Sequence, residues 1–220
     1  MRLEKASSKA VKYACSYFHY AKVMPIVSIA FSVFNAKNEW CGVITFGGGA
    51  GANMGMPYKL RYGQYLELTR MALNGKQEST SQAMSIAIKL IKKNCPSVKL
   101  LISYADKAQN HYGTIYQATN WFFVEETESS GEEVFYKGKW THNRMSSQVS
   151  KEYYKTLLKR KKSGKRKYIY ALHKSLLPLC KSLAKAYPKP AAVAHLGERL
   201  ASSQEGAFDA TVPLQNLEGI

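Results

Sequence analysis

The sequence has 220 residues, of which 45% are apolar, enough to bury one core and too many for a chain that is disordered throughout. Its 32 lysine and arginine residues against 15 acidic ones give a formal net charge of +17. Such an excess attracts polyanions, so DNA, RNA or an anionic membrane surface are the expected partners. No window approaches the roughly 20 consecutive apolar residues of a membrane span, and the N-terminus lacks the apolar core of a signal peptide. These features predict a soluble protein that is not exported.

The first predicted element is an amphipathic helix that begins near residue 4 and ends near residue 19, because its apolar residues recur at helical spacing. Alternating apolar residues in 25–34 and the apolar run 39–46 flank the turn-forming sequence "NAKN". This pattern predicts two antiparallel strands joined by a tight turn. A glycine-rich connection then leads to a third predicted strand over 65–73.

The next elements alternate between helix and strand. Residues 79–94 begin with a capping Ser or Thr and end with lysines, which the helix dipole favours there. The short apolar run 98–103 predicts a strand buried on both faces. A helix over 113–120 and a strand over 121–126 follow. This order predicts an α/β protein, of the α+β kind, whose mixed sheet is covered by helices.

Composition divides the chain into three parts. The catalytic core is predicted to occupy 1–126, and a hairpin around Lys137 and Gly138 with a basic extension is predicted to complete the domain over 127–189. Residues 151–190 contain thirteen Lys or Arg and one acidic residue. The tail 190–220 has weak periodicity and few aromatic residues, so we expect it to be mobile or peripheral.

Several polar residues fall where the predicted elements end. Asp106 follows the strand 98–103 at its carboxyl end, where open sheets place ligand-binding groups, although an aspartate there also suits a turn or helix cap. His19 and Tyr20 leave the first helix and can reach the same end of the sheet; a helix-capping histidine is the alternative. Arg70 lies in an otherwise apolar strand and needs an anionic partner. That partner can be a carboxylate of the protein, in a structural ion pair, or an anionic group of a ligand that Arg70 binds.

Six segments carry a resemblance to a known family. The end of "IYQATNWFF" (115–123) resembles the Y-x-x-x-G-F end of GCN5-related N-acetyltransferases, with Asn and Trp where Gly and Phe usually stand. Together with "FHYAKVMP", "WCGVITFG", "LELTRMAL", "SQAMSIAIKLIKK" and "ISYADKAQNHYGTIYQATNW", it resembles the Mom DNA-modification proteins of tailed phages. That family is regarded as an offshoot of the acetyltransferase superfamily. The resemblance therefore implies a GCN5-related N-acetyltransferase-like fold with a basic C-terminal extension.

The resemblance also implies an activity. Mom proteins convert adenine in duplex DNA to a derivative with a carbamoylmethyl group on the exocyclic amine, and the modified phage DNA escapes host restriction enzymes. The implied protein is a DNA adenine-modifying transferase that acts on double-stranded DNA in the host cytoplasm. Because the amine of a stacked base pair is inaccessible, the adenine must be flipped into the site.

Five residues are therefore the catalytic candidates: Asp106, Tyr116, His19, Tyr20 and Arg70. Tyr116 matches the tyrosine that acts as a general acid toward the leaving group in acetyltransferases. Its alternative role is that of a core tyrosine with a satisfied hydroxyl.

The group donor is less clearly indicated. Acetyltransferases hold coenzyme A through a [QR]-x-x-G-x-[GA] loop between strand and helix. Here "RMALNGKQESTSQ" (70–82) takes that place, and only Gly75 and the helix-start residues Ser79, Thr80 and Ser81 can serve the purpose. Simple acetyl transfer would moreover give an amide rather than the family's alkylated amine. Acetyl-coenzyme A is therefore a doubtful donor, and the donor is unknown.

A metal site is a further hypothesis. His19, Tyr20 and Asp106 supply an imidazole, a phenol and a carboxylate, which can hold iron or zinc with open positions. His111 is the nearest alternative ligand or base, although loop histidines are commonly just solvated. The spacing matches no recognised metal signature.

DNA contacts are predicted in the basic cluster "KRKKSGKRK" (159–167). The candidates are Arg160, Lys161, Lys162, Lys165, Arg166 and Lys167. A solvated flexible loop is the alternative, as it is for many charge runs.

Two other functions stay open at this stage. An N-acetyltransferase acting on a protein or small amine would bind acetyl-coenzyme A tightly. A non-catalytic basic nucleic-acid-binding protein would tolerate Asp106→Asn and Tyr116→Phe.

Overall fold

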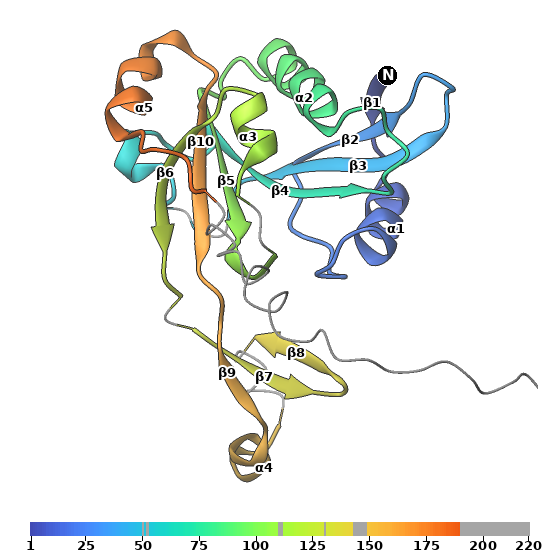
Figure 1. Ribbon diagram of the computed structural model, residues 1–220, viewed down its shortest axis with the longest axis vertical. Coiled ribbons are helices and arrows are strands. Elements are labelled where there is room, and N and C mark those ends of the chain that lie inside the picture. Colours follow the sequence, from blue (N-terminus) through green and yellow to red (C-terminus); the bar gives the residue numbers. More distant parts are fainter. Residues whose placement is uncertain (50, 52, 110–111, 130, 143–148, 190–220) are drawn as a thin grey trace, which may run out of the picture. The chain divides into compact units, whose positions relative to one another are not determined.

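The computed structural model describes residues 1–49, 51, 53–109, 112–129, 131–142 and 149–189. Seven strands form a mixed sheet in the order β1-β2-β3-β4-β5-β10-β6 (Figure 1). In that order they span Arg2–Lys5, Ile29–Phe34, Trp40–Gly47, Tyr65–Leu73, Leu100–Asp106, Lys165–Ala171 and Phe122–Thr127. All neighbouring strands run antiparallel except β4 and β5, which are parallel. The predicted mixed α/β sheet is confirmed.

Helices cover both faces of this sheet (Figure 1). The helix α2 (Thr80–Asn94) begins where the Ser79 hydroxyl accepts the Gln82 N–H, and its apolar stripe joins the core on one face, next to α3 (Thr114–Ala118). The helices α1 (Ser8–Tyr17) and α5 (Leu177–Leu183) pack on the opposite face. Successive residues of β5 alternate between the two cores, as the period of a strand requires.

A second, smaller sheet has the strand order β8-β7-β9. β7 (Glu132–Tyr136) and β8 (Lys139–His142) form the hairpin predicted around Lys137 and Gly138, both of which adopt positive φ. This backbone matches the two-residue turn that suits the twist of a hairpin. β9 (Lys159–Lys161) pairs with β7, after the short helix α4 (Lys151–Thr156).

The basic segment also contributes the strand β10, which lies between β5 and β6. Two of its cations face carboxylates on β6: Arg166 Nε lies 2.8 Å from Glu126, and Lys167 Nζ lies 3.3 Å from Glu125. These pairs compensate the charges that a strand inside a sheet would otherwise leave unpaired. The segment that follows residue 126 therefore completes the main sheet.

In the described part of the chain, three short 3₁₀ turns connect the larger elements: η1 (Met56–Tyr58), η2 (Lys107–Gln109) and η4 (Lys174–Leu176). Among the described residues no helix is long and apolar enough to cross a membrane. The predicted tail 190–220 and His111 lie outside the described residues.

Candidate active site

The candidate site lies where β4 and β5 separate. They pair in parallel only over Tyr65–Leu68 and Leu100–Ser103; beyond that, β4 continues along β3 and β5 continues along β10. A register shift on the β3 side makes Thr69 an extra residue of β4, and a bulge of this kind bends a strand. The diverging strand ends open a space between them.

This space is a cavity of about 500 Å³. All five catalytic candidates line it, and they come from the segment after α1, from β4, from β5 and from α3. The other lining residues are Leu68, Thr69, Met71, Leu73, Gly75, Gln77, Thr80, Ser103, Tyr104, Ala105, Tyr112, Gly113, Thr114 and Ile115. The five candidates selected from the sequence are therefore brought together by the fold. Their catalytic roles stay predictions.

Tyr116 is held in place by packing and by one hydrogen bond. Its ring stacks on Tyr168 with centroids 4.2 Å apart, and its hydroxyl lies 2.8 Å from the Ser103 hydroxyl. The helix starts at Gly113, where φ is +84° and a Cβ would lie 2.3 Å from the Tyr168 hydroxyl, so only glycine fits. Burial raises the pKa of Tyr116 to about 12, although the Ser103 hydrogen bond acts in the opposite direction. The phenol is therefore protonated at neutral pH and can donate a proton.

Asp106 is the last residue of β5 rather than the residue after the strand. Its Oδ1 accepts hydrogen bonds from the Ala108 N–H, at 2.9 Å, and from the Ser163 hydroxyl. One oxygen thus stabilises the turn into η2, which agrees with the turn-capping role that the sequence left open for Asp106. No hydrogen bond to the other oxygen, Oδ2, is found within the described residues. Asp106 combines a structural contact with a place in the cavity wall.

His19 and Tyr20 lie together, with ring centroids 4.3 Å apart. His19 Nδ1 accepts the Ala21 N–H at 3.1 Å, so the neutral imidazole carries its proton on Nε2. Burial raises the pKa of Tyr20, and the Asp106 carboxylate raises it further, whereas Arg70 lowers it. The phenol of Tyr20 is therefore close enough to both charges to respond to them.

Arg70 faces the cavity as a cation. Its Nη1 donates to the carbonyl of Thr69 at 2.7 Å, while its buried Nε has no hydrogen-bond partner. Among the described residues no carboxylate lies within ion-pair distance of the guanidinium. Of the two interpretations that the sequence left open, the structural ion pair has no partner among the described residues, and the ligand clamp stays a prediction.

The start of α2 borders the same cavity, through Gly75, Gln77 and Thr80. The three hydroxyl groups predicted to bind a cofactor have partners within the protein. Ser79 Oγ accepts the Gln82 N–H and lies 3.0 Å from Ser81 Oγ, and Thr80 Oγ1 accepts a hydrogen bond from the Gln77 amide. Of these three residues only Thr80 lines the cavity.

The hypothesis of bound iron gains no support from the available ligands. His19, Tyr20 and Asp106 line one cavity, but among the described residues no three His, Cys, Asp or Glu side chains come together as a metal site. His111, the alternative ligand, lies outside that part of the chain.

Sequence reasoning missed two residues that position the predicted ones. Ser103 interrupts an apolar strand and contacts Tyr116, so a lone hydroxyl residue in a buried run was the available signal. Ser163 contacts Asp106 from a segment far along the chain, for which the sequence carries no comparable signal.

The six predicted DNA-contact residues lie in different environments. On β9, Lys161 is exposed and Arg160 lies 2.7 Å from Glu133 and over the ring of Trp140. Lys162 is half-buried, and on β10 Arg166 is 8% exposed. The last two candidates, Lys165 and Lys167, are half-buried.

Lys165 also lies close to the cavity wall. Its Nζ is 5.9 Å from the ring centroid of Tyr104, a lining residue. Burial lowers the pKa of Lys165, and the neighbouring Lys162 lowers it further. Contacts between the six basic residues and DNA stay a prediction.

The protein is an α/β protein with the mixed sheet that the sequence predicted. Its polar cavity lies between two diverging strands of that sheet. The chain matches the Mom protein family over residues 1–189 and belongs to that family. It is 31% identical over 149 residues to the methylcarbamoylase Mom of Escherichia phage Mu. That alignment covers 64% of this chain and 60% of the relative, so the chain spans about 60% of the relative's length.

Similar solved structures are acetyltransferases. One is an acetyltransferase of Bacillus subtilis in complex with CoA, with a TM-score of 0.46 and 11% identity over 78% of this chain and 99% of that one. Another is the spermidine N-acetyltransferase of Vibrio cholerae in complex with CoA and spermine, with a TM-score of 0.47 and 7% identity over 80% of this chain and 97% of that one.

Proposed function

We propose that this protein is a phage DNA-modification enzyme that converts adenine in double-stranded DNA to its N-carbamoylmethyl derivative. The modified DNA would then resist host restriction enzymes in the host cytoplasm. Membership of the Mom family and the name of the Mu relative support this class of reaction. The observation that carries the proposal is the cavity in which a carboxylate, a protonated phenol, an imidazole and a guanidinium meet.

The chemistry of adenine explains why these groups are useful together. Its exocyclic amine is a poor nucleophile because the lone pair is delocalised into the ring. Asp106 would accept the amine's proton, or hydrogen-bond it, as the new carbon–nitrogen bond forms. Tyr116 would protonate the departing part of the donor. Both side chains line the same cavity, as a shared reaction site requires.

The donor in this proposal carries an anionic group that Arg70 binds. A guanidinium with a buried, unpartnered Nε is suited to a carboxylate or phosphate. We do not assign acetyl-coenzyme A itself, because acetyl transfer would give an amide instead of the alkylated amine.

Nucleoside mass spectrometry of plasmid DNA from expressing cells tests the proposal. The expected result is deoxyadenosine with the added mass of one carbamoylmethyl group in cells with the intact protein. Acetylated protein or amine in place of modified DNA would point to an ordinary acetyltransferase. Unmodified nucleosides together with DNA binding would point to a non-catalytic binding protein.

The base must leave the duplex to enter the cavity, which costs a few kcal/mol that phosphate contacts help to offset. We expect Lys161→Gln/Lys162→Gln to weaken DNA binding about equally for all sequences. The slope of log affinity against log salt should decrease by about two, because each lysine that contacts a phosphate contributes about one unit. Fluorescence anisotropy over a series of salt concentrations measures both effects.

The exposed pair Lys92 and Lys93 at the end of α2 provides a matched control. Lys92→Gln/Lys93→Gln removes the same charge from another surface and should leave more of the affinity and slope intact. Equal effects of the two double variants would mean that only net charge matters. An unchanged slope in Lys161→Gln/Lys162→Gln would remove this segment from the DNA interface.

A further inference from the structure

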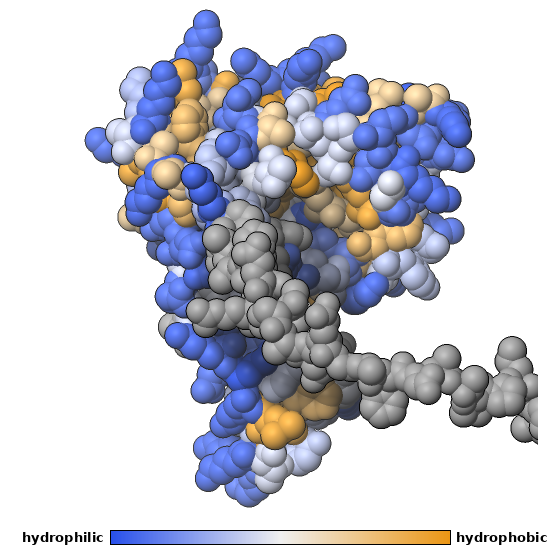
Figure 2. All heavy atoms as spheres, in the orientation of Figure 1, coloured by the Kyte–Doolittle hydropathy of each residue, from blue (hydrophilic) through white to orange (hydrophobic). Residues whose placement is uncertain are grey.

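The outer side of α1 carries aromatic rings that the core does not use. The helix buries Val11, Ala14 and Cys15 against the sheet. Tyr13 and Tyr17 remain 50% and 65% exposed, with ring centroids 4.5 Å apart. Tyr13 also contacts Phe18 and Trp40, two partly buried rings that pack against the core beneath α1. In Figure 2 pale and orange residues interrupt the blue surface over this helix. Exposed groups of this kind commonly mark a binding surface.

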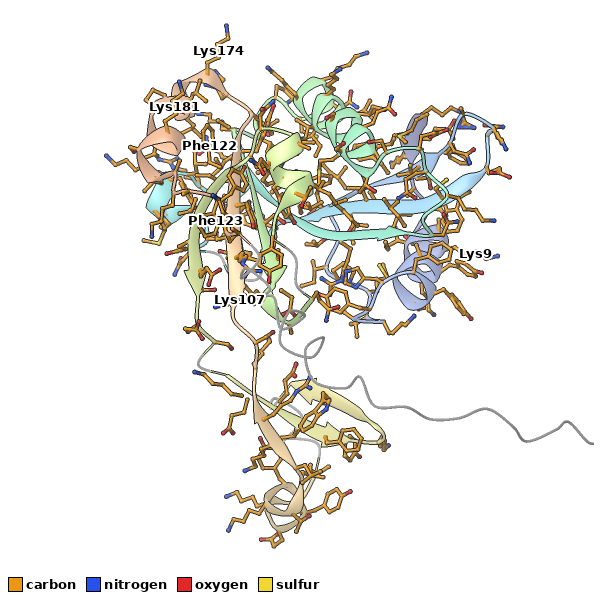
Figure 3. All side chains as sticks on the ribbon, viewed as in Figure 1. Lys9, Lys107, Phe122, Phe123, Lys174 and Lys181 are labelled. Atoms are coloured by element: carbon orange, nitrogen blue, oxygen red, sulfur yellow. The ribbon has the colours of Figure 1, made fainter. Side chains whose placement is uncertain are left out.

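The helix that carries these rings is cationic. From Lys5 to Asn38 the sequence contains no aspartate or glutamate, and α1 itself contributes Lys9 and Lys12. Figure 3 shows Lys9 on the outer side of the helix, directed away from the sheet. A partner that matches both features has an anionic backbone and flat apolar faces. Nucleic acid with unpaired bases has this chemistry, because aromatic side chains stack on bases while cations hold the phosphates.

The residues of the aromatic surface are followed directly in the sequence by two residues that line the cavity. Phe18 caps the C-terminal end of α1, and the next two residues, His19 and Tyr20, line the cavity. Tyr20 is 50% exposed, so one side of its ring is accessible from outside. DNA opened at a base in the cavity would therefore place its neighbouring bases near this surface.

We propose that α1 and residues 18–20 form a stacking surface for bases that unpair when a target base enters the cavity. This inference rests on the proposed function and adds a second binding surface to it. Paired DNA hides the faces of its bases inside the stack, so the rings contribute only after opening. The surface would thus bind opened DNA in preference to closed duplex and offset part of the cost of flipping.

Fluorescence anisotropy with two labelled duplexes tests the proposal. The duplexes have the same sequence on the labelled strand and differ only in an unpaired bubble around one adenine. The intact protein should bind the bubble more tightly. Tyr13→Ala/Tyr17→Ala should reduce this preference about tenfold, since stacking on one aromatic ring is worth roughly 1–3 kcal/mol per base. Tyr13→Phe/Tyr17→Phe keeps both rings and should retain the preference.

Two controls make the outcome decisive. Tyr62 is 73% exposed and does not line the cavity, so Tyr62→Ala should leave the preference unchanged. Tyr17→Ala alone removes the more exposed ring and should still reduce the preference if the double variant folds poorly. An unchanged preference in the alanine variants, or an equal loss in the phenylalanine variant, would overturn the inference. Mass spectrometry of plasmid DNA tests the proposed function independently, because modified adenine with no bubble preference would refute only the stacking surface.

Discussion

Asp106→Asn is expected to lower the rate of DNA modification about 10²- to 10⁴-fold, the usual contribution of a general acid or base. Asparagine has nearly the same shape, and its side-chain oxygen still accepts the hydrogen bonds from Ser163 and the Ala108 N–H. The fold and the salt dependence of DNA binding should therefore be unchanged, while the proton acceptor is lost. The modified nucleoside should disappear from cellular DNA, and the DNA should again be cut by sensitive restriction enzymes.

Two comparisons distinguish catalysis from turn capping. Asp106→Ala removes the carboxylate and its contacts, so it should lose stability in addition to activity. Ser163→Ala removes one contact of Oδ1 and keeps the carboxylate, so it should retain most of the activity. If Asp106→Asn modifies DNA at nearly the rate of the intact protein, Asp106 is a cap and the active site is misplaced.

Tyr116→Phe is expected to remove most of the activity and little of the stability. The ring keeps its stacking on Tyr168, while the hydroxyl that contacts Ser103 is lost. Loss of a proton donor should lower the turnover rate about 10²-fold or more, with DNA affinity unchanged. Single-turnover assays on a defined duplex separate the rate of the chemical step from binding.

The pH profile provides an independent test of Tyr116. Its pKa is raised to about 12, so the phenol keeps its proton below that pH and loses it only above. Titration of this group should therefore cause no fall in the rate of the intact protein between about pH 7 and pH 10. Ser103→Ala removes the neighbouring hydroxyl, and we expect a smaller loss than in Tyr116→Phe. An equal loss in Ser103→Ala would assign the essential proton to the serine instead.

Elements with strong hydrophobic periodicity were predicted well. β4 has the predicted bounds, and α2 begins one residue after the predicted start. In α2 the apolar stripe of Met84, Ala87, Ile88 and Ile91 faces the core, so local pattern and environment agree.

Two strands that were missed or placed with wrong bounds owe their stability to neighbours distant in sequence. β1 has the sequence RLEK, with no apolar pattern, and forms because its backbone pairs with β2 at the sheet edge. β5 extends three residues beyond the predicted end because β10 continues beside it as far as Asp106. Neither the pairing of β1 with β2 nor that of β5 with β10 can be identified from local sequence.

Only the part of the candidate site that lies within one short stretch of sequence was predictable. Asp106 and Tyr116 lie in one short motif, so the sequence placed them together. That Arg70 joins them depends on the separation of β4 from β5, which follows from the pairing of each strand with a different neighbour. Ser163, which holds Asp106, belongs to a segment that the charge pattern alone marked as a basic extension.

The position of β10 has a consequence for the order in which the protein matures during synthesis. β5 and β6 are made early, but the strand that pairs with both ends at Ala171. Until that residue leaves the ribosome, both strands present unpaired edges to the cell, which is a known hazard for aggregation. Asp106 gains its pairing with Lys165 and its contact with Ser163 only after that segment has been made. A chain that stops before Ser163 therefore contains every residue that lines the cavity but lacks the two contacts that hold its carboxylate in place.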